Sequence, residues 1–327
     1  MSTSPAFLYS ALGHFNRLPY PTEDCTGRVI IVTGANTGLG LEAARHFVRL
    51  NAAKVILACR SLDKAEAARR DIEATTQRAN VVESWHLDLA SVASVKDFAD
   101  RATSTLDRLD ILVNNASVLS LKWALADGHE TMITVNVIST FLLTLRLLPL
   151  LRRTGQRFNM TPHVVVVSSD AAFLPYFPER NDQSILDGLQ SKEYFRERYN
   201  TSKLLQLMVM RQLARSCDAS GKGHIIINSL NPGFCGTELF RDLPFPISIV
   251  FRVCLALFSR SPEKGSRTLM TAAFAGDESH GLWMTNCRLH QWPPLMDGDE
   301  GERLSEKFWH ELLGVLDDFD PGVSDNI

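Results

Sequence analysis

The chain has 327 residues, with 34 Lys and Arg against 37 Asp and Glu, and a net charge of −3. Hydrophobic residues make up 45% of the sequence and charged residues 22%, which is ordinary for a globular protein and argues against extensive disorder. The near-neutral charge lacks the basic excess of nucleic-acid-binding proteins, so we expect no nucleic-acid partner. Six cysteines show no CxxC or Cys/His spacing, so we expect neither a metal site nor a disulfide framework.

Targeting and membrane signals are weak in this sequence. No basic residue precedes Arg17 and the apolar stretch near the N-terminus is short, so no secretory signal is expected. The most apolar segment, 243–258, is interrupted by Arg252 and two prolines and is shorter than a membrane span. It is interpreted either as a buried or lid helix or as a segment in peripheral contact with a membrane surface. Together with the unpaired cysteines, this predicts a cytoplasmic protein.

Short apolar strands alternate with helical segments along the chain. In chain order, we expect a strand over 28–33, a helix to Leu50, a strand over 54–59, a helix over 61–77, a strand over 80–89, a helix over 91–106, a strand over 109–115, a helix over 127–153, a strand over 163–169, a helical region over 191–219, a strand over 224–230, a helix over 262–275 and a short strand near 282–286. Nearly continuous apolar strands are typical of a sheet covered by helices on both faces. The pattern predicts an α/β fold with a parallel, doubly wound sheet and a ligand at the carboxyl ends of its strands.

A glycine-rich turn follows the first strand. The glycines have the spacing G-x3-G-x-G, and the candidate cofactor-binding residues here are Gly34, Asn36, Thr37, Gly38, Leu39 and Gly40. Glycines permit a tight turn, and the next helix offers its N-terminal amides to a pyrophosphate. A glycine-rich turn without a ligand is the alternative, which the position between a strand and a helix disfavours.

The ends of the next strands carry further candidate cofactor contacts. The second strand ends in Arg60 without a carboxylate, and a guanidinium suits the 2′-phosphate of NADPH, so NADH is the less favoured cofactor. A solvated surface arginine is the alternative interpretation. Asp88, followed by Leu89, either accepts a hydrogen bond from the adenine or caps the next turn. Asn115 and Ala116 end the fourth strand and allow close packing of the cofactor ribose.

Tyr199 and Lys203 are four residues apart, which places them on one face of a predicted helix. An ammonium group near a tyrosine lowers the pKa of the phenol and allows proton exchange with an alcohol or a carbonyl. A tyrosine and a lysine at this spacing are common in proteins, so the interpretation depends on the other polar residues at the strand ends. Ser169 ends the fifth strand, Asn136 is a polar residue in a mainly apolar helix, and the sixth strand is followed by Pro232, Gly233 and Thr237.

The segments TGANTGLG, NNA, YNTSK and NPGFCGT, with Asn136 and Ser169 between them, span about residues 28–290. In this order they resemble the short-chain dehydrogenase/reductase superfamily. The resemblance implies a Rossmann-type fold, a nicotinamide dinucleotide, Tyr199 as general acid/base and Ser169 as the group that polarises a carbonyl. It also implies that Lys203 binds the nicotinamide ribose and depresses the pKa of Tyr199, and that Asn136 holds a water in a proton relay. Pro232, Gly233 and Thr237 are then expected to contact the nicotinamide.

Within the superfamily, TGANTG and the ACR end of the second strand look like the retinol-dehydrogenase and WW-domain-oxidoreductase branch. The segments LWMTNCRLHQWPP and EKFWHELL look like fungal members of that branch, many of which are assigned to secondary metabolism. Two features depart from the family pattern. Ser117 stands where glycine is usual, and 29 residues separate Ser169 from Tyr199. We expect the aromatic residues of this insert, Phe173, Tyr176, Phe177 and Tyr194, to form one wall of the substrate pocket.

These observations predict one catalytic domain over 26–290, an N-terminal extension over 1–25, a C-terminal extension over 291–327 and a substrate lid near 237–260. The lid segment is strongly apolar, which favours a lipophilic or aromatic ketone or aldehyde as substrate. The expected function is NADPH-dependent carbonyl reduction. The alternatives are alcohol oxidation, a cofactor-binding regulator without turnover, and lid residues that pack only in the core or in a dimer interface. The long helices 127–153 and 194–215 leave a homodimer open.

Overall fold

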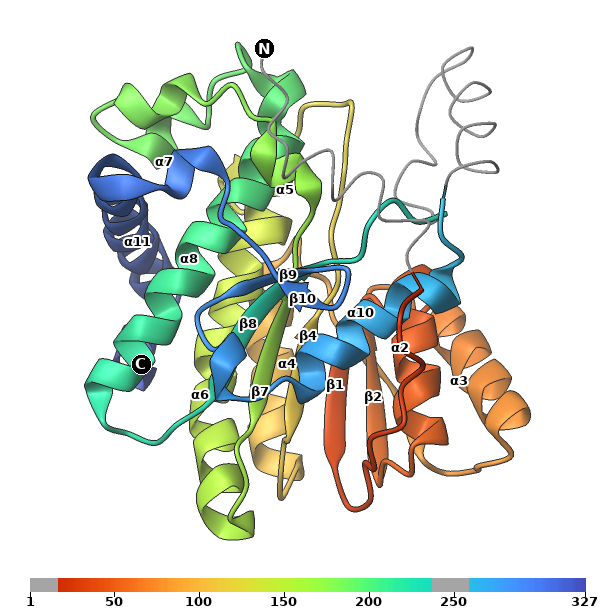
Figure 1. The fold of residues 1–327 in the computed structure, drawn as a ribbon. Helices are drawn as coiled ribbons and strands as arrows, with labels where there is room; N and C mark the ends of the chain where they lie inside the picture. Colours follow the sequence, from red (N-terminus) through yellow and green to blue (C-terminus); the bar gives the residue numbers. More distant parts are fainter. Residues whose placement is uncertain (1–16, 237–258) are drawn as a thin grey trace.

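A computed structural model describes residues 17–236 and 259–327 and places them in one α/β domain. Its centre is an eight-stranded sheet with the order β3-β2-β1-β4-β7-β8-β9-β10 (Figure 1). The strands are β1 (Val29–Thr33), β2 (Lys54–Cys59), β3 (Val82–His86), β4 (Ile111–Asn114), β7 (His163–Val167), β8 (Ile226–Asn231), β9 (Trp283–Thr285) and β10 (Arg288–Leu289). All neighbours pair in parallel except β9 and β10, which confirms the predicted doubly wound sheet.

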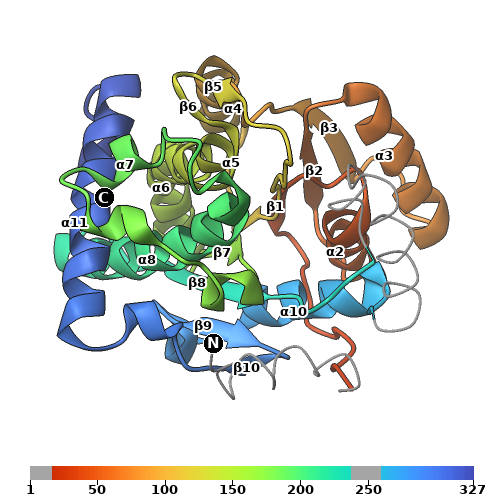
Figure 2. The ribbon, with the colours of Figure 1, turned by 90° about the horizontal axis from the view of Figure 1, so that it is seen from above.

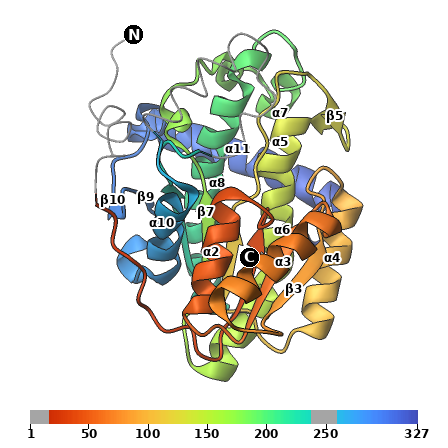
Figure 3. The same cartoon turned by 90° about the vertical axis from the view of Figure 1, so that its right-hand side faces the viewer.

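Helices cover both faces of the sheet (Figure 2). One face carries α2 (Gly38–Arg49), α3 (Leu62–Thr76) and α10 (Pro262–Phe274), and Figure 3 shows α2 and α3 side by side on it. The other face carries α4 (Val92–Thr105), α6 (Ser139–Phe158) and α8 (Arg198–Ser220). Every residue of β1 is buried, as an apolar strand between two helical layers requires. Each layer encloses its own hydrophobic cluster, so the core lies on both sides of the sheet.

The helix predicted from residue 127 begins later in the structure. Asp127 and Gly128 adopt positive φ angles of 47° and 85° and join a small hairpin, β5 (Leu125–Ala126) and β6 (His129–Glu130). The helix starts at α5 (Thr131–Ile133), passes through a π-helical turn, η2 (Thr134–Ile138), and continues as α6 to Phe158. A π-helical turn inside a long helix is frequent at functional sites, and this one contains Asn136.

The segment 291–327 forms a further helix, α11 (Gly298–Phe319), for which no element was predicted. It lies against the outer side of α8 and places Leu304, Phe308, Leu312 and Leu316 in the hydrophobic cluster of that layer (Figure 1). Arg211 of α8 donates a hydrogen bond to Ser305 Oγ at 2.9 Å. The C-terminal segment is therefore packed into the domain.

Within the described residues, one helix is long and apolar enough to cross a membrane, Thr131–Phe158. The interior of the protein buries 89% of its most apolar window, so its composition is that of a core helix. The segment 243–258, most of the expected lid, and residues 1–16 of the N-terminal extension lie outside the described residues.

Candidate active site

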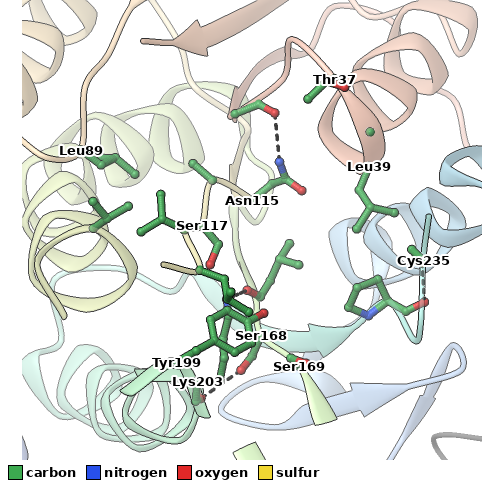
Figure 4. Close-up of a pocket in the computed structure, with 18 of the residues that line it drawn as sticks. Thr37, Leu39, Leu89, Asn115, Ser117, Ser168, Ser169, Tyr199, Lys203 and Cys235 are labelled. Carbon is green, nitrogen blue, oxygen red and sulfur yellow. Dashed lines mark hydrogen bonds between the residues drawn. The ribbon is translucent and has the colours of Figure 1, made fainter. Parts of the chain in front are cut away.

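A cavity of about 1360 Å³ opens at the carboxyl ends of β1, β2, β4, β7 and β8 (Figure 4). This volume exceeds the roughly 300–1,000 Å³ of ordinary small-molecule pockets and suits a large ligand. The predicted residues that line it are Gly34, Asn36, Thr37, Gly38, Leu39, Arg60, Asp88, Leu89, Asn115, Ala116, Ser169, Tyr199, Lys203, Pro232 and Gly233. Gly40 and Asn136 lie behind this lining, and Thr237 lies outside the described residues.

The glycine-rich turn is shaped by two positive φ angles, 64° at Gly34 and 61° at Gly38. At Gly40 a side chain is excluded by space, because a Cβ there would lie 2.5 Å from Asn115 Nδ2 and 2.7 Å from the Gly34 carbonyl oxygen. Glycine permits both the backbone conformation and the close approach of β4. Gly40 therefore shapes the turn from behind, while Gly34 and Gly38 face the cavity.

The N-terminus of α2 points its first backbone amides at the cavity. Thr37 precedes the helix with extended backbone, and among the described residues no side chain caps these amides and no acidic residue stands in the first turn. Uncapped amides and the positive end of the helix dipole form an anion site. This end of the cavity fits the pyrophosphate of a dinucleotide.

Two exposed cationic side chains stand at the rim beside β2. Arg60 follows β2 directly, and Lys64 lies one turn into α3, whose first turn is capped by Ser61 Oγ. The sequence analysis missed Lys64, although its spacing of four residues from Arg60 was visible. The described part of the cavity lining contains no carboxylate at the end of β2, so this corner fits a phosphate better than bare ribose hydroxyls.

Asp88 and Asn115 make protein contacts as well as lining the cavity. Asp88 Oδ1 accepts a hydrogen bond from the Ala90 amide at 3.0 Å, which is the turn-capping alternative considered for it. Asn115 Nδ2 donates to the Thr33 carbonyl oxygen at 2.9 Å and ties the end of β4 to the glycine turn. Asn115 thus holds the cofactor end of the cavity in shape.

Tyr199 and Lys203 project from α8 toward Ser169 at the end of β7 (Figure 4). Ser169 is a hydrogen-bond partner of the Tyr199 phenol, whereas the neighbouring Ser168 is buried and donates to the Lys203 carbonyl oxygen at 3.0 Å. Lys203 Nζ lies 5.7 Å from the centre of the Tyr199 ring and donates to the Val167 carbonyl oxygen at 3.1 Å. The structure thus brings Ser169, Tyr199 and Lys203 together.

Burial governs the charges of this group. It lowers the pKa of Lys203 to about 7, because desolvation disfavours the ammonium form. It raises the pKa of Tyr199 above its ordinary value, and the Ser169 hydrogen bond partly opposes that shift. Tyr199 keeps some exposure to the cavity, which limits the effect. Burial is the larger cause of the shift in the Tyr199 pKa, and the phenol is protonated at neutral pH. The depression of this pKa by Lys203 stays a prediction.

Asn136 is fully buried behind the cavity wall. Its Oδ1 accepts hydrogen bonds from Ser117 Oγ at 3.0 Å and from the Val118 amide at 2.9 Å, and its Nδ2 donates to Ser202 Oγ at 3.0 Å. Ser117, which replaces the glycine usual in the family, is therefore part of this network. The main-chain carbonyl oxygen of Asn136 accepts a hydrogen bond from Gln206 Nε2 at 2.6 Å, and the predicted water on Asn136 stays a prediction.

The loop after β8 is held by an arginine that the sequence analysis did not identify. Arg260 is buried, and its Nη1 donates to the Pro232 carbonyl oxygen at 2.8 Å. Gly233 has a φ of 78°, and a Cβ on it would lie 2.6 Å from Arg260 Nη1. Asn231 Oδ1 accepts from the Gly233 amide at 3.0 Å. These contacts fix Pro232 and Gly233 against the cavity.

The insert between Ser169 and Tyr199 contributes Asp170 and Ala171 to the described cavity wall, and none of its four aromatic side chains. Phe177 turns into the core, Phe173 packs on Trp283, and Tyr176 pairs with Tyr194 at the surface. The prediction that these rings line the substrate pocket is therefore wrong for the described residues. Phe173 contacts a strand that is distant in the sequence, and Tyr176 and Tyr194 contact each other within the insert, which spacing along the chain does not reveal.

Comparison with known proteins agrees with this geometry. The family described as short chain dehydrogenase matches residues 28–179. The chain is 42% identical over 327 residues to the short chain dehydrogenase/reductase dmxR8 of Cryptosporiopsis sp. (strain 8999), covering 98% of this chain and 99% of that protein. It is 46% identical over 276 residues to the short chain dehydrogenase atnD of Emericella nidulans, covering 83% of this chain and 87% of that protein.

Among solved structures, the fold is similar to that of the Pseudomonas aeruginosa RhlG/NADP active-site complex. The TM-score is 0.61 at 23% identity, and the match covers 81% of this chain and 97% of that one. A reductase from Brucella melitensis complexed with NADH is also similar, with a TM-score of 0.58 at 22% identity over 80% of this chain and 97% of that one. The chain belongs to the short-chain dehydrogenase/reductase family and is an oxidoreductase with the Rossmann-type fold of that family.

Proposed function

We propose that the protein is an NADPH-dependent carbonyl reductase that acts on a lipophilic or aromatic ketone or aldehyde. The observation that carries the proposal is the meeting of Ser169, Tyr199 and Lys203 in the cavity that also contains the α2 amides and the Arg60–Lys64 corner. The dinucleotide would be held by the glycine turn, by this corner, by Asp88 and Leu89, and by Ala116, Pro232 and Gly233. When bound, the reduced nicotinamide supplies a hydride to the carbonyl carbon.

The protein's own groups supply the rest of the chemistry. Ser169 Oγ donates a hydrogen bond to the carbonyl oxygen and polarises it. Tyr199 carries its proton at neutral pH and gives it to the same oxygen as negative charge develops there. The Lys203 ammonium stabilises the tyrosinate that remains and binds the ribose hydroxyls.

The Arg60–Lys64 corner, which fits the 2′-phosphate of NADPH, supports reduction over the alternative, alcohol oxidation. The meeting of the catalytic groups disfavours the second alternative, a cofactor-binding regulator without turnover. The fungal relatives support a substrate from fungal secondary metabolism. We also propose a cytoplasmic location, which is compatible with the burial of the long apolar helix Thr131–Phe158 in the core.

The substrate class follows from the described wall beside the catalytic group. Val118, Leu119, Val135 and Phe234 present apolar surface there, which favours a lipophilic ligand. Asp170 is the carboxylate on this wall, and its Oδ1 accepts from Asn231 Nδ2 at 2.6 Å. The Asp170 charge also interacts with the Arg260 guanidinium, so the substrate preference rests on the apolar wall alone. We therefore expect an uncharged ketone or aldehyde rather than a keto acid.

The cofactor preference is tested by Arg60→Asp, with Lys64→Glu as a second variant. A charge-assisted contact to the 2′-phosphate contributes about 1.5–3 kcal/mol, so each variant is expected to lower the preference for NADPH over NADH by about 10- to 100-fold. Fluorescence titration of both nucleotides measures the ratio of dissociation constants. Arg70→Asp, at an exposed position further along α3, is the matched control. An unchanged ratio in both rim variants would refute the assignment of NADPH.

A further inference from the structure

The ammonium group of Lys203 contacts a buried glutamine, Gln206. Gln206 lies one helical turn beyond Lys203 on α8 and is almost fully buried. Its Oε1 accepts a hydrogen bond from Lys203 Nζ at 3.0 Å, and its Nε2 donates to the Asn136 carbonyl oxygen at 2.6 Å. One amide side chain thus bridges the ammonium on α8 and the backbone of the π-helical turn η2.

The chemistry of the two partners fixes the orientation of this amide. An ammonium group carries only donors, and a backbone carbonyl oxygen only accepts, so the Gln206 oxygen faces Lys203 and its nitrogen faces Asn136. The π-helical turn disturbs the regular hydrogen-bond ladder around Asn136, where such turns often serve functional sites. The bridge therefore satisfies two buried polar groups at once, as buried polar groups require.

Among the described contacts of Lys203 Nζ, Gln206 is the side chain that accepts a hydrogen bond from it. Val167 of β7 supplies a carbonyl oxygen to Lys203, and Tyr199 of α8 is the titratable neighbour. Asp170, in η3 (Asp170–Phe173), accepts a hydrogen bond from Asn231. Burial is the cause of the lowered pKa of Lys203, and no charged side chain of residues 17–236 or 259–327 offsets it. An acceptor on the ammonium is what opposes the loss of its proton.

We propose that Gln206 is a positioning residue that holds the Lys203 ammonium in its charged, ribose-binding place and ties it to the Asn136 carbonyl oxygen. This inference rests on the role given to Lys203 in the proposed function. Two of the three ammonium donors are used by Val167 and Gln206, which leaves one for the ribose hydroxyls. An amide has no titratable proton in the physiological range, so Gln206 orients Lys203 without exchanging a proton with it.

The test is a titration of NADPH binding between about pH 5 and about pH 9, followed by nicotinamide fluorescence. In the unsubstituted protein, affinity is expected to fall as Lys203 loses its proton, with a midpoint near pH 7. Gln206→Met keeps the length and removes the acceptor, so the midpoint is expected to move down and the affinity at pH 7 to fall by about tenfold. Gln206→Glu adds a negative charge beside the ammonium and is expected to raise the midpoint by about one unit or more.

Gln212→Met is the matched control, because Gln212 is a buried glutamine on the same helix that binds Glu302 Oε1 at 2.8 Å, away from the cavity. Circular dichroism checks that each variant is folded. The proposal is overturned if the pH midpoint of NADPH binding in both Gln206 variants stays within about 0.3 units of the midpoint in the unsubstituted protein. If Gln206→Met unfolds, the result with Gln206→Glu decides. If the unsubstituted protein prefers NADH, the proposed cofactor preference fails, and the same titration with NADH still tests Gln206.

Discussion

At the residue scale, the candidate active site contains polar groups whose charge is set by burial. Lys203 and Tyr199 lie four residues apart on α8, and burial disfavours the charged form of both. A protonated phenol and an ammonium that titrates near neutrality are suited to proton donation followed by stabilisation of the tyrosinate. The activity is therefore expected to depend on pH through Lys203.

The sign of this dependence follows from the direction of the shift. The pKa of Lys203 is lowered from 10.5 to about 7, so the folded protein loses this charge as the pH rises through about 7. Without the ammonium, the tyrosinate formed during reduction is less stable. We expect kcat/KM for NADPH, which reports the free enzyme, to fall as the pH rises through this value.

Lys203→Arg provides the control, because a guanidinium keeps its charge throughout this range. Any activity that remains in this variant is expected to lack the fall near neutrality. Steady-state rates at saturating ketone and varied NADPH measure both profiles. An identical fall in the arginine variant would show that another group is responsible.

At the element scale, the insert before α8 is anchored by a buried ion pair. Arg198 Nη1 lies 2.8 Å from Glu179 Oε1, both side chains are almost fully buried, and Arg198 Nη2 donates to the Ser191 carbonyl oxygen at 2.9 Å. Because Arg198 directly precedes Tyr199, this pair fixes the start of the helix that carries the proposed general acid.

Glu179→Leu is expected to destabilise the protein by about 3–5 kcal/mol, because it leaves the Arg198 charge buried without its partner. Denaturant unfolding measures this loss. The double variant Glu179→Leu with Arg198→Leu removes both charges and is expected to recover part of the stability. A double variant that is no more stable than Glu179→Leu alone would argue against an unpaired charge as the cause.

At the scale of the whole molecule, α11 completes the helical layer that contains α8 and the proposed catalytic residues on it. It covers the outer side of α8 through its apolar face and through the contact of Arg211 with Ser305. A homodimer formed through this side of α8 would have to displace α11. We therefore expect no dimer through α8, and light scattering on the purified protein tests its mass in solution.

The stabilising role of α11 is tested by Phe308→Ala. Phe308 is fully buried, and truncation of such a side chain costs about 3–5 kcal/mol. Glu306→Ala, at an exposed position of the same helix, is the control and is expected to change stability by less than about 0.5 kcal/mol. Equal unfolding free energies for the two variants, measured by denaturant titration, would show that α11 is not part of the core.

The sequence predicted the strands and most of the polar residues that line the cavity at their ends, because strand–helix alternation and the glycine turn are local patterns. It did not predict the bridge made by Gln206, because Asn136 is 70 residues away in the chain. Arg260 and the aromatic residues of the insert were missed or misplaced for the same reason. Their partners, Pro232 for Arg260 and Trp283 for Phe173, are brought near only by the folded sheet.

The proposed chemistry depends on Tyr199 as the proton donor. The direct measurement is NADPH oxidation, followed by loss of nicotinamide absorbance, with a panel of uncharged lipophilic and aromatic ketones and aldehydes. The unsubstituted protein is expected to reduce at least one of them, and Tyr199→Phe is expected to lower the rate by about 10²- to 10⁴-fold while its NADPH dissociation constant stays within about twofold. Two results would contradict the account: an unchanged turnover rate in Tyr199→Phe, or no turnover of any compound by the unsubstituted protein.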